Sequence, residues 1–398
     1  MKALLLEGVH PDATAYLQGA GIEVSTRPGA LDERGLSEAL QGVQLLGIRS
    51  RTRVTRSVLA DATELIAIGA FCIGTNQVAL GAAAEKGVAV FNAPFSNTRS
   101  VVELALAEMI CLTRGLTDKN GALHAGVWDK SAKGAHEMRG RTLGIIGYGN
   151  IGSQLSVLAE GLGMRVVFFD TADRLPMGNA RSVSSVDELL EVADIVSLHV
   201  DGRPGNAGMF ESEQFAAMRP GSIFLNLSRG FVVAQGALAA HIRSGHVAGA
   251  AIDVFPIEPK AQGDPFESEL RGLPNVILTP HVGGSTEEAQ KDIGGFVADK
   301  LLDYIGTGSS VLSVNLPQTR LEGGESSHRL AHLHANTPGV LATVNSVLAQ
   351  HNVNIEGQAL STRDHLGYLL TDVGTDYAPE VVDVLNRMPE TVRLRVLS

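Results

Sequence analysis

Cysteine is scarce in this chain, since only Cys72 and Cys111 occur among its 398 residues. Two cysteines cannot build a disulfide framework, and they fit a protein of the reducing cytoplasm. No apolar stretch approaches the roughly 20 residues that a membrane-spanning helix needs. The short apolar run at the N-terminus meets Glu7 too soon for a signal peptide. We therefore expect a cytoplasmic protein with no membrane attachment.

Positive charge is also in deficit, because 32 Lys and Arg residues face 43 Asp and Glu residues, for a net charge of -11. This balance argues against non-specific binding to nucleic acids, so no nucleic-acid partner is expected. An anionic substrate would have to meet a local group of basic residues. The length, with 44% hydrophobic residues and no repeat array, predicts a soluble protein of two or three domains.

Short apolar strands alternate with helical patterns in two stretches, which favours an α/β protein with parallel sheets. Strands are expected in the first stretch at 3–6, 45–48 and 65–68, within a flavodoxin-like domain. In the second stretch, residues 97–285 predict a doubly wound Rossmann-type domain, with strands at 143–147, 166–170, 195–199, 222–227, 249–255 and 276–279. A long helix from 286 would return the chain to the first domain, making that domain discontinuous (1–96 and 286–316).

The remaining segments are a connecting helix, a linker and a C-terminal domain. Ser100 and Glu103 predict a capping box for an apolar helix that reaches about Leu116. Residues 317–327 are polar and carry Gly323-Gly324, which indicates a flexible linker. Residues 328–398 follow the order strand, helix, strand, strand, helix, strand, which predicts a ferredoxin-like domain.

A dinucleotide fingerprint, GYGNIG, occupies residues 147–152, between an expected strand and an expected helix. Its glycines, Gly147, Gly149 and Gly152, would let a pyrophosphate approach the N-terminus of that helix. Asp170 follows Gly149 by 21 residues, where an acid accepts the adenosine ribose hydroxyls and disfavours NADP. The cofactor is therefore expected to be NAD. The alternative is a glycine turn in a sheet that binds nothing.

A set of three residues that follows the fingerprint in the sequence suits the oxidation of an alcohol beside a carboxylate. Arg229 in NLSRG can clamp the carboxylate with two parallel hydrogen bonds. His281 in TPHVGGS can take a proton near neutral pH, and Glu258 in DVFPIEP would stabilise the imidazolium. Each follows an expected strand, and parallel sheets bind ligands at the carboxyl ends of their strands. The alternatives are a surface ion pair for Arg229, a solvated loop acid for Glu258 and a structural loop histidine for His281.

Arg49 and Arg51 flank Ser50 at the end of the second expected strand. Two guanidinium groups at this spacing suit a multiply charged anion such as a phosphate monoester, and the alternative is a solvated basic turn. Trp128 is the only tryptophan, and the alternative to a functional role for it is ordinary core packing. A further group lies at expected turns of the C-terminal domain and consists of His334, Asn336 and Asn354. The alternative to a functional role for these residues is turn formation and helix capping.

Stretches that run nearly end to end carry a family resemblance, among them GIRSRT, NAPFSNTRSVVE, LGIIGYGNIGSQL, LNLSRG, GAAIDVFPIEP, TPHVGGSTEEAQ and NTPGVL. With these, the chain resembles the D-3-phosphoglycerate dehydrogenase family, within the D-2-hydroxyacid dehydrogenase superfamily, in the bacterial form that carries one C-terminal ACT domain. The residues 200–209, VDGRPGNAGM, depart from the family's usual loop.

The resemblance implies roles for individual residues. Arg229, Glu258 and His281 would be catalytic, and Arg49, Arg51 and Asn97 would contact the substrate anion. Trp128 and Lys130 would reach toward a neighbouring subunit, and His334, Asn336 and Asn354 would bind an effector serine. NAD would be surrounded by Gly147, Gly149, Asn150, Ile151, Gly152, Asp170, His199, Leu227, Ser228, Arg229, Asp253, His281, Gly283 and Gly284.

The resemblance further implies oxidation of D-3-phosphoglycerate to 3-phosphohydroxypyruvate, the first step of serine biosynthesis. It implies inhibition by L-serine, a side reduction of 2-oxoglutarate, a homotetramer and no metal. Two alternatives remain open. One is another D-2-hydroxyacid dehydrogenase, such as a glyoxylate or hydroxypyruvate reductase. The other is a non-catalytic NAD-sensing interaction protein on the same fold.

Overall fold

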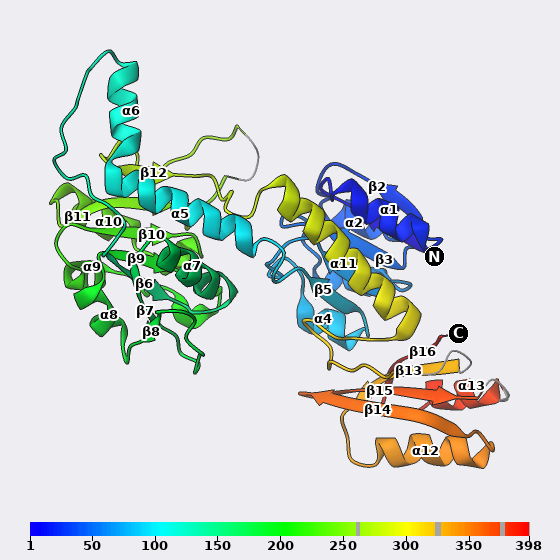
Figure 1. Ribbon diagram of the computed structural model, residues 1–398. Coiled ribbons are helices and arrows are strands. Elements are labelled where there is room, and N and C mark those ends of the chain that lie inside the picture. The colour runs from blue at the N-terminus through cyan, green and yellow to red at the C-terminus, as the bar shows by residue number, and fades with distance from the viewer. Residues whose placement is uncertain (260–262, 323–327, 375–378, 398) are drawn as a thin grey trace. The chain divides into compact units, whose positions relative to one another are not determined.

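The computed structural model describes residues 1–259, 263–322, 328–374 and 379–397 (Figure 1). The chain divides into two compact units, one of Met1–Ser96 with Gln290–Ser398 and one of Asn97–Ala289. Parallel sheets form both α/β domains and an antiparallel sheet forms the C-terminal domain, so the predicted fold class is confirmed.

The first unit begins with a parallel sheet of order β2-β1-β3-β4-β5. Helices α1 and α11 contribute to the buried cluster on one face, and α2, α3 and α4 to that on the other. This is the strand order of flavodoxin-like sheets, in which successive strands are added on one side of β1 and then, from β3 onward, on the other. The elements are β1 (Lys2–Leu5), α1 (Pro11–Gly19), β2 (Glu23–Thr26), α2 (Glu33–Ala39), β3 (Leu45–Ile48), α3 (Arg56–Asp61), β4 (Ala67–Ala70), α4 (Leu80–Glu85) and β5 (Ala89–Asn92).

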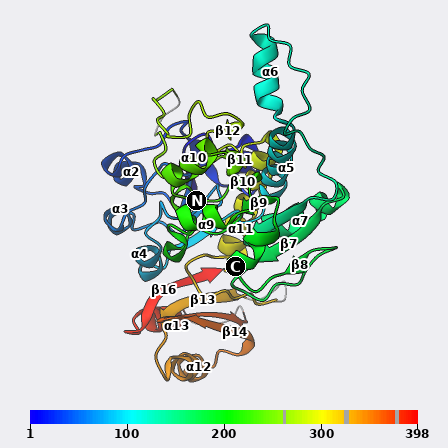
Figure 2. The same cartoon turned by 90° about the vertical axis from the view of Figure 1, so that its left-hand side faces the viewer.

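The second unit holds a seven-stranded parallel sheet of order β12-β11-β10-β9-β6-β7-β8. Helices α5 and α7 pack on one face and α9 and α10 on the other (Figure 2). Helix α8 shares the buried cluster of α9 and α10. This is the doubly wound order, with its reversal between β6 and β9. The elements are α5 (Thr98–Arg114), α6 (Leu116–His124), β6 (Thr142–Ile146), α7 (Asn150–Gly161), β7 (Arg165–Phe169), β8 (Arg181–Ser182), α8 (Val186–Val192), β9 (Ile195–Leu198), η1 (Pro204–Asn206), α9 (Ser212–Ala217), β10 (Ser222–Asn226), η2 (Gly230–Val232), α10 (Gln235–Arg243), β11 (Val247–Ile252) and β12 (Val276–Leu278).

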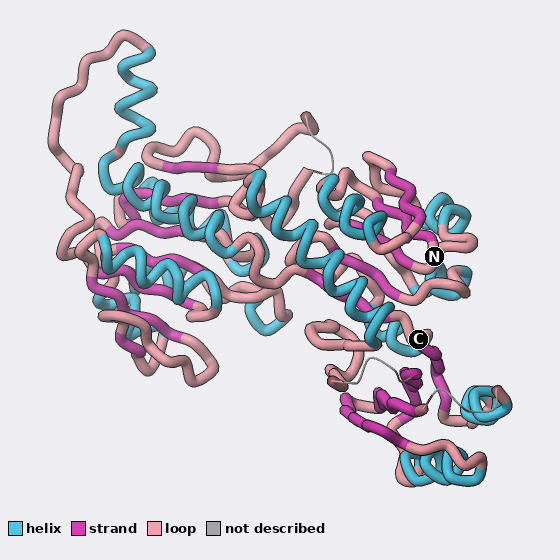
Figure 3. The backbone as a smooth tube through the Cα atoms, turned by 45° about the vertical axis from the view of Figure 1, so that its right-hand side comes forward, coloured by secondary structure: helices cyan, strands magenta, loops and turns pink. Residues whose placement is uncertain are grey.

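Helix α11 (Glu287–Thr307) leads back into the first unit, where the C-terminal domain has the sheet order β14-β15-β13-β16. Helices α12 and α13 share a buried cluster with one face of this sheet (Figure 3). The other face packs into the core of the first unit, where Leu333 and Tyr368 share a cluster with Tyr304. The elements are β13 (His328–Ala335), α12 (Val340–Gln350), β14 (Ile355–Arg363), β15 (Leu366–Val373), α13 (Glu380–Asn386) and β16 (Thr391–Leu397).

The predicted start of the connecting helix is wrong. Helix α5 begins at Thr98, and Asn97 is its N-cap. The Ser100 hydroxyl lies 2.8 Å from the Thr286 hydroxyl, and Glu103 accepts a hydrogen bond from Arg99, so neither side chain caps the helix. The helix also ends earlier than predicted, because Gly115 adopts a left-handed φ of 55° and α6 follows.

The segment predicted as a linker begins in packed structure. Thr319 is buried, and its N–H donates to the Ser310 hydroxyl over 2.9 Å. Gly323 and Gly324 lie outside the described residues. Strand β4 begins at Ala67, two residues later than the sequence pattern indicated.

Candidate active site

The glycine loop between β6 and α7 has the shape that a dinucleotide needs. Gly147 has a φ of +93°, and a Cβ there would lie 2.6 Å from the His199 carbonyl oxygen. A Cβ at Gly152 would strike the Gly147 carbonyl oxygen, so that glycine permits α7 to pack closely on the loop. A Cβ at Gly149 would face open space, which leaves room for a pyrophosphate near the helix N-terminus.

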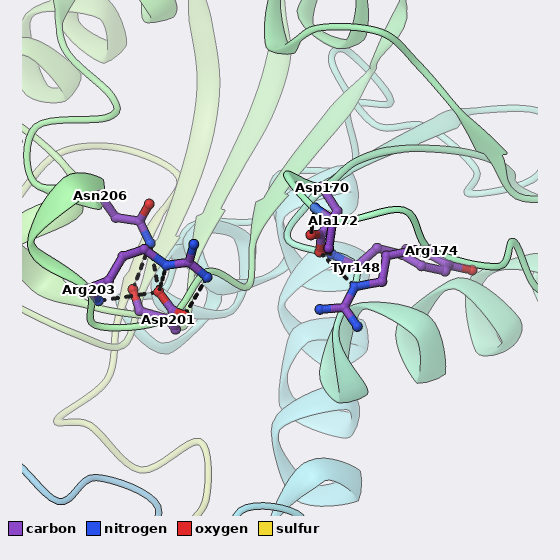
Figure 4. A network of polar contacts seen from close by, with 7 residues as sticks. All are labelled: Tyr148, Asp170, Ala172, Arg174, Asp201, Arg203 and Asn206. Carbon is purple, nitrogen blue, oxygen red and sulfur yellow. Dashed lines mark hydrogen bonds and ion pairs between the residues drawn. The ribbon is translucent and has the colours of Figure 1, made fainter. Parts of the chain in front are cut away.

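Asp170 lies just beyond the end of β7, and backbone groups already hold its carboxylate (Figure 4). One oxygen accepts the N–H of Tyr148 at 2.8 Å, and the other accepts the N–H of Ala172 at 2.9 Å. The Arg174 Nε lies 3.5 Å from the first oxygen. A carboxylate has about four lone-pair directions, so Asp170 keeps capacity for ribose hydroxyls.

The loop that departs from the family's usual sequence carries a second polar cluster (Figure 4). The Arg203 guanidinium donates to both oxygens of Asp201, at 2.8 and 2.7 Å, and Asn206 donates to the same carboxylate. The hydrogen bond to Asp201 raises the pKa of Arg203, and the negative charge of Asp170 adds to that effect. Asp201 therefore holds the Arg203 guanidinium in the loop that follows β9.

His281 and Glu258 form a hydrogen-bonded pair. The His281 Nδ1 lies 2.9 Å from one Glu258 oxygen and 3.1 Å from the other. The Phe255 N–H donates to the same carboxylate, which fixes its direction. In neutral His281, Nδ1 carries the proton that it donates to Glu258, so Nε2 is the basic nitrogen.

Electrostatics in this pair favour a protonatable histidine. The hydrogen bond to Glu258 raises the pKa of His281, against the opposing effects of burial and of the Arg229 charge. Burial alone would raise the pKa of Glu258, but the hydrogen bond and charge of His281, with the Phe255 N–H and Arg229, lower it. Arg229 acts on both groups, so all three residues share one electrostatic environment at the carboxyl ends of the strands.

Arg229 follows β10 in a loop that is held internally. Its Nη1 donates to the Ser228 carbonyl at 2.6 Å, and its carbonyl accepts from the Asn226 amide at 3.0 Å. The Ser228 hydroxyl also donates to Asn226, and Ser228 and Leu227 are buried. His199 lies just after β9, where its Nε2 is 2.9 Å from the Ser197 hydroxyl, and burial lowers its pKa to about 4.

Asp253 holds the histidine loop, which the sequence pattern did not reveal. Its carboxylate accepts from the Thr279 hydroxyl at 2.6 Å and from the N–H groups of Val282 and Gly283 at 2.8 and 2.9 Å. Its carbonyl accepts the N–H of His281 at 2.8 Å. These bonds fix the loop although His281 has a φ of +55°, a costly value for a residue other than glycine.

Glu108 on α5 is a residue that the sequence reasoning missed. It is 2% exposed, and neither carboxyl oxygen has a hydrogen-bond partner among the described residues. Burial, with a smaller effect of the Asp253 charge, raises its pKa to about 8. A helix position with a periodic apolar face gives no sign of this, because α5 packs against β10 and β11, which are distant from it in the sequence.

The predicted anion contacts divide between the two units. Asn97 is in the second unit, where its side chain lies against Gly284. Arg49 and Arg51 belong to the first unit, just after β3. Their N–H groups, with that of Thr52, donate to the buried carboxylate of Glu7.

The predicted effector residues do not form one cluster within the chain. His334 is buried on β13 beside Gly367, and Asn336 follows that strand, where its amide donates to the Asp364 carbonyl. The ladder β13–β15–β14 places Asn354 at the opposite end of the sheet from Asn336. At about 3.3 Å per residue along β14, the two ends are roughly 25 Å apart. Neither asparagine caps α12, whose N-cap is Gly339.

Trp128 is 79% exposed, so its core-packing alternative is wrong. It follows α6, near the exposed side chains of Leu123 and Val127, and Lys130 is exposed as well. Within the described residues, no helix is long and apolar enough to cross a bilayer. The same residues contain no group of three or more His, Cys, Asp or Glu side chains that could hold a metal.

Comparisons with known proteins identify relatives of this chain and of two of its regions. The family profile "D-isomer specific 2-hydroxyacid dehydrogenase, NAD binding domain" matches residues 106–283, and "AHAS small subunit-like ACT domain" matches residues 330–393. The chain is 48% identical to D-3-phosphoglycerate dehydrogenase of Escherichia coli (strain K12), over 100% of this chain and 97% of that protein. The corresponding Dictyostelium discoideum protein is 46% identical over the same shares of the two chains.

Among solved structures, the TT0316 protein from Thermus thermophilus is similar, with a TM-score of 0.69 and 30% identity. The match covers 76% of this chain and 96% of that one. The relatives match from end to end, and the glycine loop has the space that a dinucleotide requires.

Proposed function

We propose that this chain, which belongs to the D-3-phosphoglycerate dehydrogenase family, oxidises D-3-phosphoglycerate to 3-phosphohydroxypyruvate with NAD, the first step of serine biosynthesis. The observation that carries the proposal is the Glu258–His281 pair, 2.9 Å apart, in the same electrostatic environment as Arg229. In this proposal the chain has four parts, which are a substrate-binding domain (1–96 and 286–316), an NAD-binding domain (97–285), a linker (317–327) and a regulatory domain (328–398).

In the proposed reaction, Nε2 of neutral His281 takes the proton of the C2 hydroxyl. Glu258, bonded to Nδ1, keeps the ring oriented and stabilises the imidazolium that forms. Arg229 binds the carboxylate and stabilises the carbonyl that develops at C2. Bound NAD supplies the hydride acceptor. The residues proposed to hold it are the glycine loop, Asn150, Ile151, Asp170, His199, Leu227, Ser228, Arg229, Asp253, His281, Gly283 and Gly284, with Asn97 on the substrate side.

Arg49 and Arg51 are the proposed contacts of the substrate phosphate. A hydrogen bond between charged groups contributes about 1.5–3 kcal/mol, so replacing either by Ala should raise KM for phosphoglycerate roughly ten- to hundredfold. An unchanged KM in both variants would favour the plain hydroxyacid reductase.

Turnover tests the proposal against its alternatives. We expect NADH formation with D-3-phosphoglycerate, much less with D-glycerate, and a loss of about 10²-fold or more in kcat for His281→Asn with NAD binding retained. Equal turnover of both substrates would indicate another D-2-hydroxyacid dehydrogenase. Absence of turnover in a folded protein that binds NAD would indicate an NAD-sensing protein. Reduction of 2-oxoglutarate by NADH is a proposed side activity, measured in the same assay.

The ACT domain suggests allosteric regulation, and we propose that L-serine is the inhibitor. Because Asn336 and Asn354 lie at opposite ends of one sheet, the proposed serine site joins His334 and Asn336 of one copy to Asn354 of another. Within the described sheet, β14 pairs only with β15, so its outer edge is free for such an assembly.

Subunit mixing tests the shared site. Asn336→Ala and Asn354→Ala should each lose serine inhibition, whereas a reassembled mixture should regain part of it, because a mixed pair contains one intact site. A mixture as insensitive as its parents would contradict the shared site. The proposed assembly is a homotetramer, in which Trp128 and Lys130 reach a neighbouring subunit. Sedimentation of the full chain measures it.

A further inference from the structure

Glu7 occupies an unusual position at the carboxyl end of β1. It is 4% exposed, and its φ of 62° lies in the left-handed region that residues other than glycine avoid. It lies at the point where the strand order of the five-stranded parallel sheet reverses, between β1 and β3. Open α/β sheets bind ligands in the crevice at this point. A buried acid in strained backbone persists only where the surrounding structure holds it, and such residues cluster at functional sites.

The Glu7 carboxylate gathers the backbone of the arginine loop that follows β3. One oxygen accepts the N–H of Thr52 at 2.7 Å and that of Arg49 at 3.3 Å. The other accepts the N–H of Arg51 at 2.9 Å, and the Arg51 Nε lies 3.7 Å from it. One internal carboxylate therefore takes three backbone donors of this loop that would otherwise be available to an anion.

Gln77 holds the same loop from its carbonyl side. Its amide nitrogen donates to the Arg49 carbonyl at 2.7 Å and to the Gly74 carbonyl at 3.2 Å, and Gln77 is 7% exposed. The backbone of Arg49 is thus fixed at both its N–H and its carbonyl. The Arg51 side chain remains 53% exposed, so fixing the backbone leaves this guanidinium accessible.

We propose that Glu7 is a positioning residue for substrate recognition: it fixes the loop from which Arg49 and Arg51 present their guanidinium groups to the substrate phosphate. This inference rests on the proposed function, and Glu7 itself touches no substrate. Because its carboxylate takes the loop's N–H groups, recognition of the dianion falls to the two guanidinium groups. Their planar donors pair with phosphate oxygens two at a time.

Glu7→Gln separates this role from simple space filling. Glutamine has nearly the same shape, but its amide nitrogen is a donor and would face at least one backbone N–H of the loop. We expect KM for D-3-phosphoglycerate to rise roughly tenfold or more, while kcat and the affinity for NAD stay within about twofold. The ratio of kcat/KM for phosphoglycerate to that for D-glycerate should fall by a similar factor.

Two further variants make the experiment decisive. Gln77→Met removes the donor on the opposite side of the loop and should raise the same KM, which tests the idea if Glu7→Gln does not fold. The control is Glu23→Gln, because Glu23 is an exposed acid on the neighbouring strand β2. This substitution also removes one negative charge, and it should leave kcat and the KM for D-3-phosphoglycerate unchanged.

An unchanged KM in folded Glu7→Gln and Gln77→Met would overturn the positioning role. An equal loss of kcat/KM on both substrates would overturn it too, because a general structural defect would not select against the phosphate. A wild-type enzyme without preference for the phosphorylated substrate would instead refute the proposed function, so the two failures are distinguishable.

Discussion

Glu108 provides a stability prediction that can be worked from the structure. Burial, with a smaller effect of the Asp253 charge, raises its pKa from an ordinary 4.5 to about 8. In the folded state Glu108 is therefore a neutral acid at pH values where the unfolded chain has lost that proton. Folding must retain the proton, so the group's contribution is complete below the unfolded pKa and is lost as pH rises toward about 8.

The size of the effect follows from this shift. Each pKa unit corresponds to about 1.4 kcal/mol, so Glu108 costs about 2 kcal/mol near pH 6 and about 4 kcal/mol near pH 7.5. Glu108→Gln cannot ionise and escapes this cost. Its stability relative to the wild type should therefore increase by about 2 kcal/mol between those two pH values. Packing and hydrogen-bonding differences between Glu and Gln act equally at both pH values and cancel in the comparison.

Urea unfolding of the full chain, followed by circular dichroism at both pH values, measures this difference. Glu103→Gln is the matched control, because Glu103 is on the same helix but exposed, and its substitution should show no comparable pH dependence. If the stability difference between Glu108→Gln and wild type is the same at both pH values, Glu108 does not carry a raised pKa and the reasoning is refuted.

Three shorter predictions concern the NAD-binding domain. Glu258→Gln removes the negative charge and weakens the hydrogen bond that raises the pKa of His281, so the acidic limb of the pH profile for oxidation should move to lower pH while kcat falls. An acidic limb that does not move would show that Glu258 does not set the pKa of His281. Asp170→Asn should weaken NAD binding and narrow the preference over NADP, measured as kcat/KM for both cofactors. Gly147→Ala should destabilise the fold by about 1–3 kcal/mol and abolish NAD binding, because its φ is +93° and the methyl group would meet a carbonyl oxygen; normal cofactor titration would contradict this.

The sequence by itself determined the order of elements and the chemistry they carry. Strand β9 spans Ile195–Leu198, within the predicted range 195–199, because hydrophobic patterning is local. The glycine fingerprint was also recognised from the sequence, because its spacing between a strand and a helix is local, although the His199 carbonyl that restricts Gly147 follows another strand. The same local signals placed Glu258 and His281 after their strands, and the sheet then brought the two side chains within 2.9 Å.

Tertiary structure alone decided which distant side chains meet. Ser100 bonds to Thr286 instead of capping its helix, and nothing near Ser100 in the sequence shows this. Glu7 meets a loop more than 40 residues away because β1 and β3 are neighbours in the sheet. Strand pairing likewise put Asn336 and Asn354 at opposite ends of one sheet, although only a helix separates them in the sequence. Periodicity reports which face of an element is buried, whereas strand order and register select what it is buried against.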